Sequence, residues 1–512
     1  MKEDCFMLSK IISKVQIIFI IFTAFIIIGC SIDPGIDGVL PKEEFTLLEF
    51  YSDNMVFQQN SEFKIIGKSE EGVVLKASLY NENDELIVKS ESMADVNGDF
   101  TIVMKGQKGS FKHYYLEITD GLNVKKIQHI SFGDVWIFAG EQEYQTTEIE
   151  YDEEYDFSNI SFIRSIAGKI VWSKYEESDH IYSLVKTIAV SLKEKINVPV
   201  AFVDASLVSG YADSWMSYET ATKHKNINKY LSDIERYDEE QTTLKNANKL
   251  SSMYETYFNG LKGIEIKGII WSQGVTEFKN YDKFNKNVFI SNYVYLLIQM
   301  FNDMMNSFNN NIDIYCIQES YLDEEYAAEL REIQAISTYQ IKDVHLIPTY
   351  DSFVKVENDS NEDEGTTDTV LEEDTEEIEE IYEFSIYNYI ERIIDIIFNC
   401  SYTKKTTNVS TSYTDFIVDN YQIKISFDES YELQEVEELF GLQIINNDGV
   451  EISFEFTIQE NDLYINLLLD ESTKTDDFSY TIYYGYVKDI YKCNLRTTSG
   501  MPIVPFRINI NK

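Results

Sequence analysis

Basic residues are scarce in this sequence. Its 512 residues include 43 lysines and arginines against 88 aspartates and glutamates, which leaves a formal net charge of -45 at pH 7. Such a field repels the phosphates of nucleic acids and anionic lipid headgroups. The composition therefore argues against a nucleic-acid partner and disfavours a free acidic sugar as a ligand. Hydrophobic residues make up 44% of the chain, which is typical of a globular protein of about two or three domains.

Cysteines are few as well. The five in the chain are scattered, and they show neither the spacing of a zinc site nor the pattern of a disulfide framework. We therefore expect no metal and no other cofactor. In the folded part we expect Cys316, Cys400 and Cys493 to be small buried hydrophobic residues, with at most one disulfide among them.

Residues 1–30 are typical of a lipoprotein signal. Two lysines precede an apolar run over residues 17–28, as in the charged and apolar regions of a secretory signal. The run ends in Ile27-Ile28-Gly29-Cys30, which resembles a bacterial lipobox. That resemblance implies a diacylated Cys30 that holds the protein on a membrane from the extracytoplasmic side, with residues 31–44 as a tether. A transmembrane anchor is the alternative, but a span needs about 17 apolar residues or more.

The rest of the chain divides into three segments by its pattern of apolar residues. Residues 45–130 and 401–512 carry short β-type runs between turn signals, which predicts a β domain at each end. Residues 131–400 alternate short apolar runs with longer helical patterns, which predicts βαβ units and a parallel sheet. The expected strands lie near 135–138, 198–203, 266–271, 312–317 and 344–348, and the expected helices near 181–196, 288–308 and 324–339.

One acidic segment stands apart within the central domain. Residues 357–383 contain 14 acidic residues and no basic one. Mutual repulsion and the scarcity of apolar groups predict a solvated loop. A cation-binding arm is the alternative interpretation of this segment.

Eight short motifs follow one another between residues 53 and 507. They are Asp53–Gln58, Ala94–Phe100, Gly133–Trp136, Ser214–Ser217, Lys267–Gly274, Leu330–Gln334, Asn494-Leu495 and Gly500–Arg507. In their order they are similar to the motifs of the sialate O-acetylesterase family. This resemblance implies an α/β fold whose central domain is a flavodoxin-like SGNH hydrolase, with three layers around a parallel sheet, flanked by N-terminal and C-terminal β domains.

The resemblance places the catalytic serine, aspartate and histidine of the family at Gln142, Glu380 and Tyr382. Ester hydrolysis of this kind needs a hydroxyl nucleophile, an imidazole that takes its proton and a carboxylate that orients the imidazole. An amide cannot be deprotonated to attack an ester, and a phenol with an ordinary pKa of about 10 is a poor base at neutral pH. The three positions are therefore predicted to be inert.

Other residues could supply the chemistry instead. The start of a strand lies away from the carboxyl edge where sites form in such sheets, which argues against a site on the strand at 344–348. Glu141 and Glu143, which follow the expected strand near 135–138, are interpreted as solvated residues of a degenerate loop. The pairs that we considered are Glu141 with Glu143, Glu177 with His180, and Asp343 with His345.

Two functions from different classes follow. The first is a surface lipoprotein built on an inactive esterase fold and retained as a glycan-binding or structural protein. In that case Gln273, Trp271 and Gly140 are expected to line what remains of the pocket. The second is an active carbohydrate O-acetylesterase whose catalytic residues have moved. The replacement of all three triad residues favours the first.

Overall fold

The computed structural model describes the chain in several stretches. No helix in these stretches is long and apolar enough to cross a membrane. The predicted signal, the triad positions 142 and 380, and Glu143 lie outside them. The described residues are 43–141, 149, 155–166, 169–174, 181–207, 210–233, 236, 249–261, 263–278, 286–308, 311–320, 326–356, 381–403, 411–469 and 479–511.

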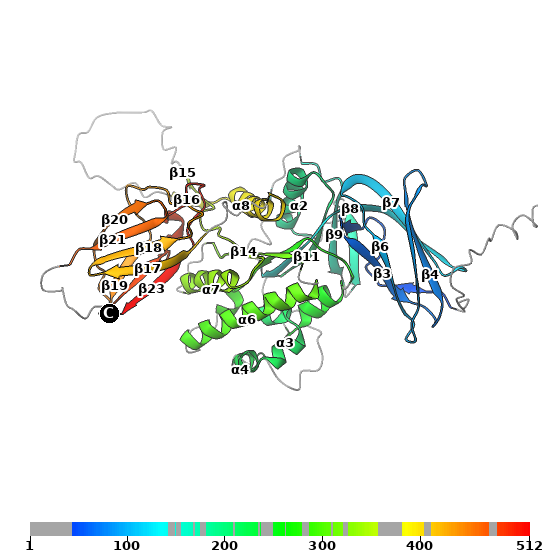
Figure 1. The fold of residues 1–512 in the computed structure, drawn as a ribbon, viewed down its shortest axis with the longest axis horizontal. Helices are drawn as coiled ribbons and strands as arrows, with labels where there is room; N and C mark the ends of the chain where they lie inside the picture. Colours follow the sequence, from blue (N-terminus) through cyan, green and yellow to red (C-terminus); the bar gives the residue numbers. More distant parts are fainter. Residues whose placement is uncertain are drawn as a thin grey trace, which may run out of the picture.

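A large sheet forms the middle of the molecule (Figure 1), and its strands lie in the order β10-β9-β11-β8-β12-β13-β14. Neighbours from β9 to β14 pair in parallel, whereas β10 pairs with β9 in the antiparallel direction. The predicted parallel strands are thus part of a mixed sheet. The strands are β8 (Val124–Glu141), β9 (Ile160–Ile166), β10 (Lys169–Lys174), β11 (Val200–Leu207), β12 (Gly268–Ser272), β13 (Asp313–Ile317) and β14 (Val344–Ile347).

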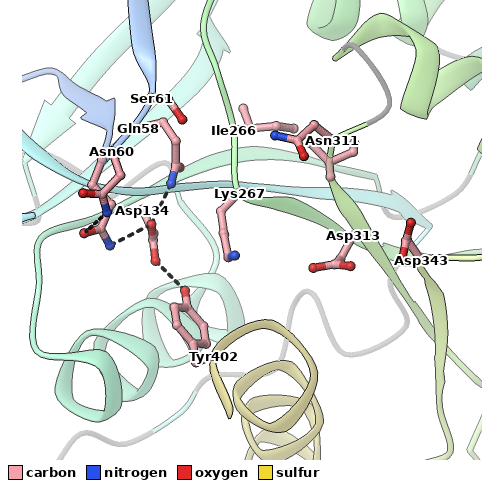
Figure 2. Close-up of a pocket in the computed structure, with 12 residues that line it drawn as sticks. Gln58, Asn60, Ser61, Asp134, Ile266, Lys267, Asn311, Asp313, Asp343 and Tyr402 are labelled. Atoms are coloured by element: carbon pink, nitrogen blue, oxygen red, sulfur yellow. Dashed lines mark hydrogen bonds between the residues drawn. The ribbon is translucent and has the colours of Figure 1, made fainter. Parts of the chain in front are cut away.

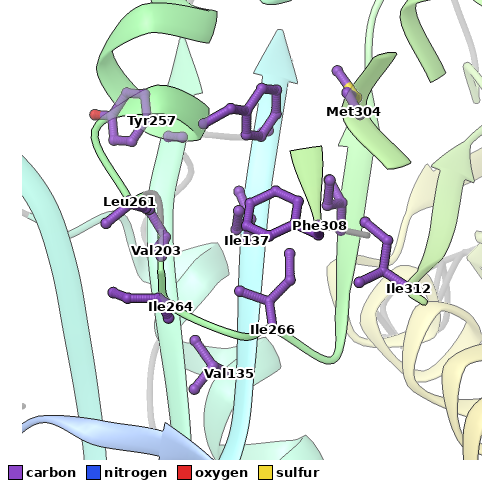
Figure 3. Packing of buried hydrophobic residues seen from close by; sticks show 14 of the residues in the cluster. Val135, Ile137, Val203, Tyr257, Leu261, Ile264, Ile266, Met304, Phe308 and Ile312 are labelled. Atoms are coloured by element: carbon purple, nitrogen blue, oxygen red, sulfur yellow. The ribbon is translucent and has the colours of Figure 1, made fainter. Parts of the chain in front are cut away.

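Helices cover both faces of this sheet. Side chains alternate along a strand, so Trp136 and Phe138 of β8 join the hydrophobic cluster beneath α2 and α8, whereas Val135 and Ile137 join the cluster beneath α6 and α7. Figure 3 shows part of the cluster beneath α6 and α7. The three predicted helices are confirmed as α2, α6 and α7. The helices are α2 (Ser183–Ile196), α3 (Tyr218–Lys223), α4 (Lys225–Asp233), α6 (Lys286–Ser307), α7 (Ala327–Tyr339) and α8 (Ile386–Phe398).

The N-terminal β part is continuous with the central sheet. The first half of β8 pairs with β7 and the second half with β11 and β12, so the predicted boundary at residues 130 and 131 lies inside one strand. Both parts also share one hydrophobic cluster. The strands of this part are β1 (Thr46–Leu47), β2 (Val56–Gln58), β3 (Glu62–Lys68), β4 (Val74–Asn81), β5 (Leu86–Met93), β6 (Asp99–Lys105) and β7 (Ser110–Thr119).

The C-terminal β part consists of two sheets around a cluster of their inward-facing side chains. One sheet has the order β17-β18-β21-β20 and the other the order β19-β22-β23. Burial alternates along β18 and β22, as expected for strands with one buried face. The strands are β17 (Tyr413–Asp419), β18 (Gln422–Phe427), β19 (Leu442–Asn446), β20 (Phe454–Gln459), β21 (Asp462–Leu467), β22 (Ser479–Tyr484) and β23 (Phe506–Asn511).

The acidic segment lies between two paired strands, β15 (Phe353–Val356) and β16 (Ile381–Phe384). Its last residues, 381–383, were predicted to be loop but form most of β16. The reason is aromatic packing, because the ring of Phe384 contacts Phe353 and the ring of Tyr382 contacts Tyr491, with centroids 5.5 and 5.0 Å apart. The remainder, residues 357–380, lies outside the described part.

Replacing residues 357–380 with Asn-Gly is expected to change the melting temperature by no more than a few degrees. Val356 lies opposite Ile381 in the ladder, so a two-residue turn can close the hairpin, and closure entropy changes slowly with loop length. Thermal melts of the two proteins test this. Removing the hairpin as well, residues 353–384, should lower the melting temperature clearly. A large drop from the loop replacement alone would show that the segment is packed or binds a structural cation.

Candidate functional site

The carboxyl edge of the parallel strands is where ligands bind in sheets of this kind, and here β8 and β12 end side by side. Gly140 lies opposite Ser272 in the ladder. Its φ of +96° lies in the left-handed region, and a Cβ at this position would lie 2.0 Å from the Ser272 carbonyl oxygen. Only glycine fits this close approach. Gly140 thus brings the end of β8 against β12.

Gln273 links the segments that meet at this edge. Its Oε1 accepts a hydrogen bond from the Glu141 backbone N–H at 3.1 Å, and its Nε2 donates to the Gly210 carbonyl oxygen and to the Glu277 carboxylate, the latter at 3.0 Å. The side chain of Gln334 in turn donates to the Gln273 carbonyl oxygen at 3.0 Å. The Gln273 amide therefore bridges protein groups, whereas the sequence suggested that it lines a pocket.

Trp271 and Gly140 are interior residues too. Trp271 is 1% exposed, and its ring packs edge to face on Trp215 and Phe301, with centroids 5.4 and 6.4 Å apart. Gly140 is buried between β11 and β12. The prediction that these residues with Gln273 line a pocket is corrected accordingly, because neighbouring strands and helices cover them.

Two carboxylates are buried at the same edge. Glu141 is 5% exposed, and its carboxylate accepts hydrogen bonds from the N–H and the hydroxyl of Thr276. Glu277, in α5 (Val275–Phe278), is 4% exposed and accepts from the Ala212 N–H and from Gln273. The prediction that Glu141 is a solvated loop residue is wrong, because a distant segment supplies its donors.

Burial raises the pKa of Glu277 to about 8, and the nearby charge of Glu141 contributes to the rise. Glu277 is therefore mainly protonated at neutral pH. Burial also raises the pKa of Asp213, although the guanidinium of Arg236, which binds both carboxylate oxygens at 2.9 and 3.1 Å, offsets part of that rise. Such shifts occur at active sites and in structural networks alike. Here protein donors occupy both oxygens of Glu277.

Sequence reasoning missed Glu277 and Asp213, although each lies in or beside a motif. Glu277 follows Gln273 by four residues, at a position where the family motif has already ended, and Asp213 directly precedes the Ser214–Ser217 motif. The available signal was a carboxylate in or beside a motif. The sequence could not reveal the hydrogen-bond partner of this carboxylate, because Glu277 accepts from the backbone N–H of Ala212, which belongs to a distant segment.

The described histidines are spread over several elements of the fold. His113 is in β7 and His129 in β8, both within the N-terminal β part, and the His224 Nδ1 lies 3.1 Å from the Tyr295 hydroxyl. His345 is the second residue of β14, near the amino end of that strand. His180 lies outside the described residues. No described histidine therefore forms a hydrogen bond with Glu141, Gln273 or Glu277.

His345 pairs with Asp313 of β13, and not with Asp343 as the sequence suggested. The His345 Nε2 lies 3.4 Å from an Asp313 carboxylate oxygen. Burial alone would lower the pKa of His345, but hydrogen bonds with Asp313 and Cys400 outweigh it and raise the pKa to about 9. The Ser401 hydroxyl donates to the other Asp313 oxygen at 2.9 Å, so it is not positioned as a nucleophile beside the imidazole.

Several of the motifs contact one another. The side chain of Gln58, in the first motif, donates a hydrogen bond to the Asp134 carboxylate at 2.7 Å and accepts one from the Val135 backbone N–H at 2.9 Å. Glu332 forms an ion pair at 3.1 Å with Arg507 of the last motif. These contacts join the N-terminal strands to β8, and α7 to the C-terminal sheets. The motifs thus include residues that hold the parts of the fold together.

Metal binding finds no support within the described residues, because no group of three or more histidines, cysteines, aspartates or glutamates is arranged to hold an ion. Cys316, Cys400 and Cys493 are free thiols. Cys316 and Cys493 are buried, as predicted, and burial raises the pKa of each thiol to about 12.

Comparison with solved structures shows the fold. A carbohydrate acetylesterase from Xanthomonas citri superimposes with a TM-score of 0.67 and 14% sequence identity, over 91% of this chain and 99% of that one. A protein from Arabidopsis thaliana (TM-score 0.29, 11% identity, 54% of this chain and 99% of that one) and the β-glucuronidase of Ruminococcus gnavus (TM-score 0.18, 8% identity, 56% and 58%) are less similar. No protein-family model and no curated protein matches the sequence.

Proposed function

We propose that this chain is a surface lipoprotein whose body is an inactive member of the sialate O-acetylesterase family, retained to bind a glycan or to serve a structural role. The observation that carries the proposal is the carboxyl edge itself. Glu141, Gln273 and Glu277 are buried there and bonded to protein groups, and no described histidine forms a hydrogen bond with them. An esterase of the serine type needs an accessible hydroxyl with an imidazole beside it.

The strand order supports the SGNH part of this proposal. The five neighbouring strands β11-β8-β12-β13-β14, numbered among themselves along the chain, have the order 2-1-3-4-5, which is the flavodoxin-like order. The strand β9 is an addition to this order, because it pairs in parallel with the outer side of β11. The likeness to the Xanthomonas citri acetylesterase extends over nearly all of this chain. The pairing of Gln58 with Asp134, and of Glu332 with Arg507, explains why these motif residues persist in a protein that has no use for the triad.

The isolated body, residues 45–512, is expected not to hydrolyse 4-nitrophenyl acetate or acetylated sugars above the buffer rate. Loss of one triad residue commonly costs a factor of about 10⁴ or more, and here all three are replaced. An active carbohydrate acetylesterase assayed in parallel is the positive control. The Gln142→Ser variant should stay inactive, because a hydroxyl without a base is a weak nucleophile.

Turnover by the wild-type protein would instead support the alternative, an active carbohydrate O-acetylesterase with relocated residues. The likeness to an acetylesterase is the observation in its favour. If the His345→Ala variant abolished that turnover, the site would lie at the amino edge near Asp313. If the Glu141→Ala variant abolished it, the carboxyl edge would be active after all.

The membrane attachment is tested separately. Replacing Cys30 with alanine is expected to leave the protein unlipidated and to move it from the membrane fraction to the soluble fraction, because two acyl chains provide stable anchoring and a bare tether does not. Metabolic labelling with a fatty acid, followed by fractionation, measures both effects. A Ser31→Ala variant is the matched control. An unlabelled protein that stays in the membrane with its N-terminus uncleaved would favour a transmembrane anchor.

A further inference from the structure

A cavity lies at the amino edge of the central sheet, opposite the edge discussed above. It has a volume of about 480 Å³, within the range of about 300 to 1,000 Å³ that is usual for small-molecule sites. Figure 2 shows side chains from several segments around it. Gln59 comes from the N-terminal part, Lys267 and Asp313 from the amino ends of β12 and β13, and Tyr402 from the turn after α8.

Two of the carboxylates in this cavity already have partners. Asp134 accepts hydrogen bonds from Gln58 and Gln59 at 2.7 and 3.0 Å and from the Tyr402 hydroxyl at 2.5 Å. Asp313 accepts from Ser401 and pairs with His345. Their charges remain, but their strongest acceptor positions are occupied. A ligand in the cavity would therefore form its hydrogen bonds with other lining residues.

Lys267 is one of these residues. Its ammonium group makes no hydrogen bond and no ion pair with the described residues. It lies 5.3 Å from the centroid of the Tyr402 ring, and its charge contributes to lowering the pKa of Asp313. In Figure 2 it projects between Asp134 and Asp313. Asn311, whose amide both donates and accepts, lines the same space. An ammonium with three donors in a cavity that also holds carboxylates calls for a ligand that accepts and donates from neighbouring atoms.

We propose that this amino-edge cavity binds a neutral saccharide, with one hydroxyl accepting from Lys267 and neighbouring hydroxyls bonding to Asn311 and to the carboxylate of Asp343. A hydroxyl both donates and accepts, which matches a lining of one ammonium, amides and carboxylates. This deepens the proposed glycan-binding role by giving it a site distinct from the former catalytic edge.

Other ligand classes fit the lining less well. A divalent cation is disfavoured because Lys267 lies among the carboxylates and no described metal-binding group exists. An anion is disfavoured because Asp134, Asp313 and Asp343 surround the single lysine of the lining. A zwitterion such as an amino acid would satisfy both charges, so it belongs in the test as a competing ligand.

Saturation-transfer NMR on residues 45–512 with glucose, galactose, mannose, xylose and N-acetylglucosamine identifies a bound sugar, and calorimetry gives its affinity. The Lys267→Met variant keeps most of the aliphatic stem and removes the donor, so it is expected to weaken binding at least tenfold. The Asn311→Ala variant, at an exposed residue, should weaken it by a smaller factor. The control is Lys105→Met, at an exposed lysine of β6, which should leave the affinity unchanged. Melting temperatures verify folding.

The results separate this proposal from the absence of catalysis. Ester hydrolysis by the wild-type protein would refute the inactive-esterase proposal and leave the sugar site untouched. Absence of binding for all five sugars would overturn the sugar site, as would tighter binding of glycine or of N-acetylneuraminic acid than of any neutral sugar. Sugar binding that both Lys267→Met and Asn311→Ala leave intact would place the ligand elsewhere and refute the cavity. If the Lys267→Met variant fails to fold, the affinity of the Asn311→Ala variant alone tests the cavity.

Discussion

Replacing Asp134 with alanine is expected to lower the free energy of unfolding by about 2 to 4 kcal/mol. The side chain is 1% exposed, and its carboxylate accepts from Gln58, Gln59 and Tyr402. Hydrogen bonds to a charged acceptor contribute roughly 1.5 to 3 kcal/mol, and a buried donor left without an acceptor is costly. Water from the adjacent cavity can reach Gln59 and Tyr402, which keeps the loss below the sum of three such bonds.

Denaturant unfolding of the Asp134→Ala and Asp134→Asn variants measures this loss. Asparagine keeps one acceptor oxygen and offers an N–H to the Tyr402 hydroxyl, so its loss should be intermediate. The control is Asp99→Ala, another motif aspartate, whose side chain is 53% exposed and pairs with Lys68 at the surface. That variant should lose less than about 1 kcal/mol. Equal losses at the two aspartates would mean that Asp134 does not join the N-terminal strands to β8.

The sequence predicts the strands of the central sheet well because their signal is local. The apolar runs that became β8, β11, β12, β13 and β14 are buried on both faces, so they contain few polar residues and stand out between helical patterns. The hairpin of β9 and β10 gave no such signal. Its residues include charged ones at Arg164, Lys169 and Lys174. Charged residues are normal in an edge strand such as β10, which contains the two lysines.

The candidate site was less predictable because its contacts join distant residues. The buried carboxylate of Glu141 accepts a hydrogen bond from the distant Thr276. His345 pairs with Asp313, although Asp343 is nearer in sequence. Neither partner follows from spacing. The motifs predicted an α/β fold like that of a carbohydrate esterase, and they include residues such as Gln58 and Asp134 that hold this fold together. They could not show that the edge they surround is filled by carboxylates.

The buried pair at that edge should make stability depend on pH. The folded-state pKa of Glu277 is about 8, against 4.5 for an ordinary glutamate. Below pH 4.5 both states are protonated, so Glu277 costs nothing. As the pH rises from 4.5 to 8, the unfolded state releases this proton and the folded state retains it, so stability falls. Above pH 8 the loss is complete, on the order of 4 to 5 kcal/mol for a shift of this size.

Glu277→Gln is therefore expected to gain stability relative to the wild type as the pH rises from 4 to 9, by an amount of that order. A glutamine brings its own cost, because its amide nitrogen faces the donating nitrogen of Gln273, but this cost does not change with pH. The informative quantity is thus the pH dependence of the difference between the two proteins, measured by denaturant unfolding. Glu141→Gln should show a smaller gain, since it removes the neighbouring charge and leaves the burial of Glu277 in place.

The acidic composition makes a control necessary, because a chain with a net charge of -45 loses stability with rising pH through general repulsion. Glu219→Gln, at an exposed residue of α3, removes the same single charge without touching the buried pair. Its stability difference from the wild type should stay nearly constant across the range. If Glu277→Gln behaved in the same way, Glu277 would be ionised in the folded protein at neutral pH, and the carboxyl edge would hold two negative charges that a cation or a bound water must offset.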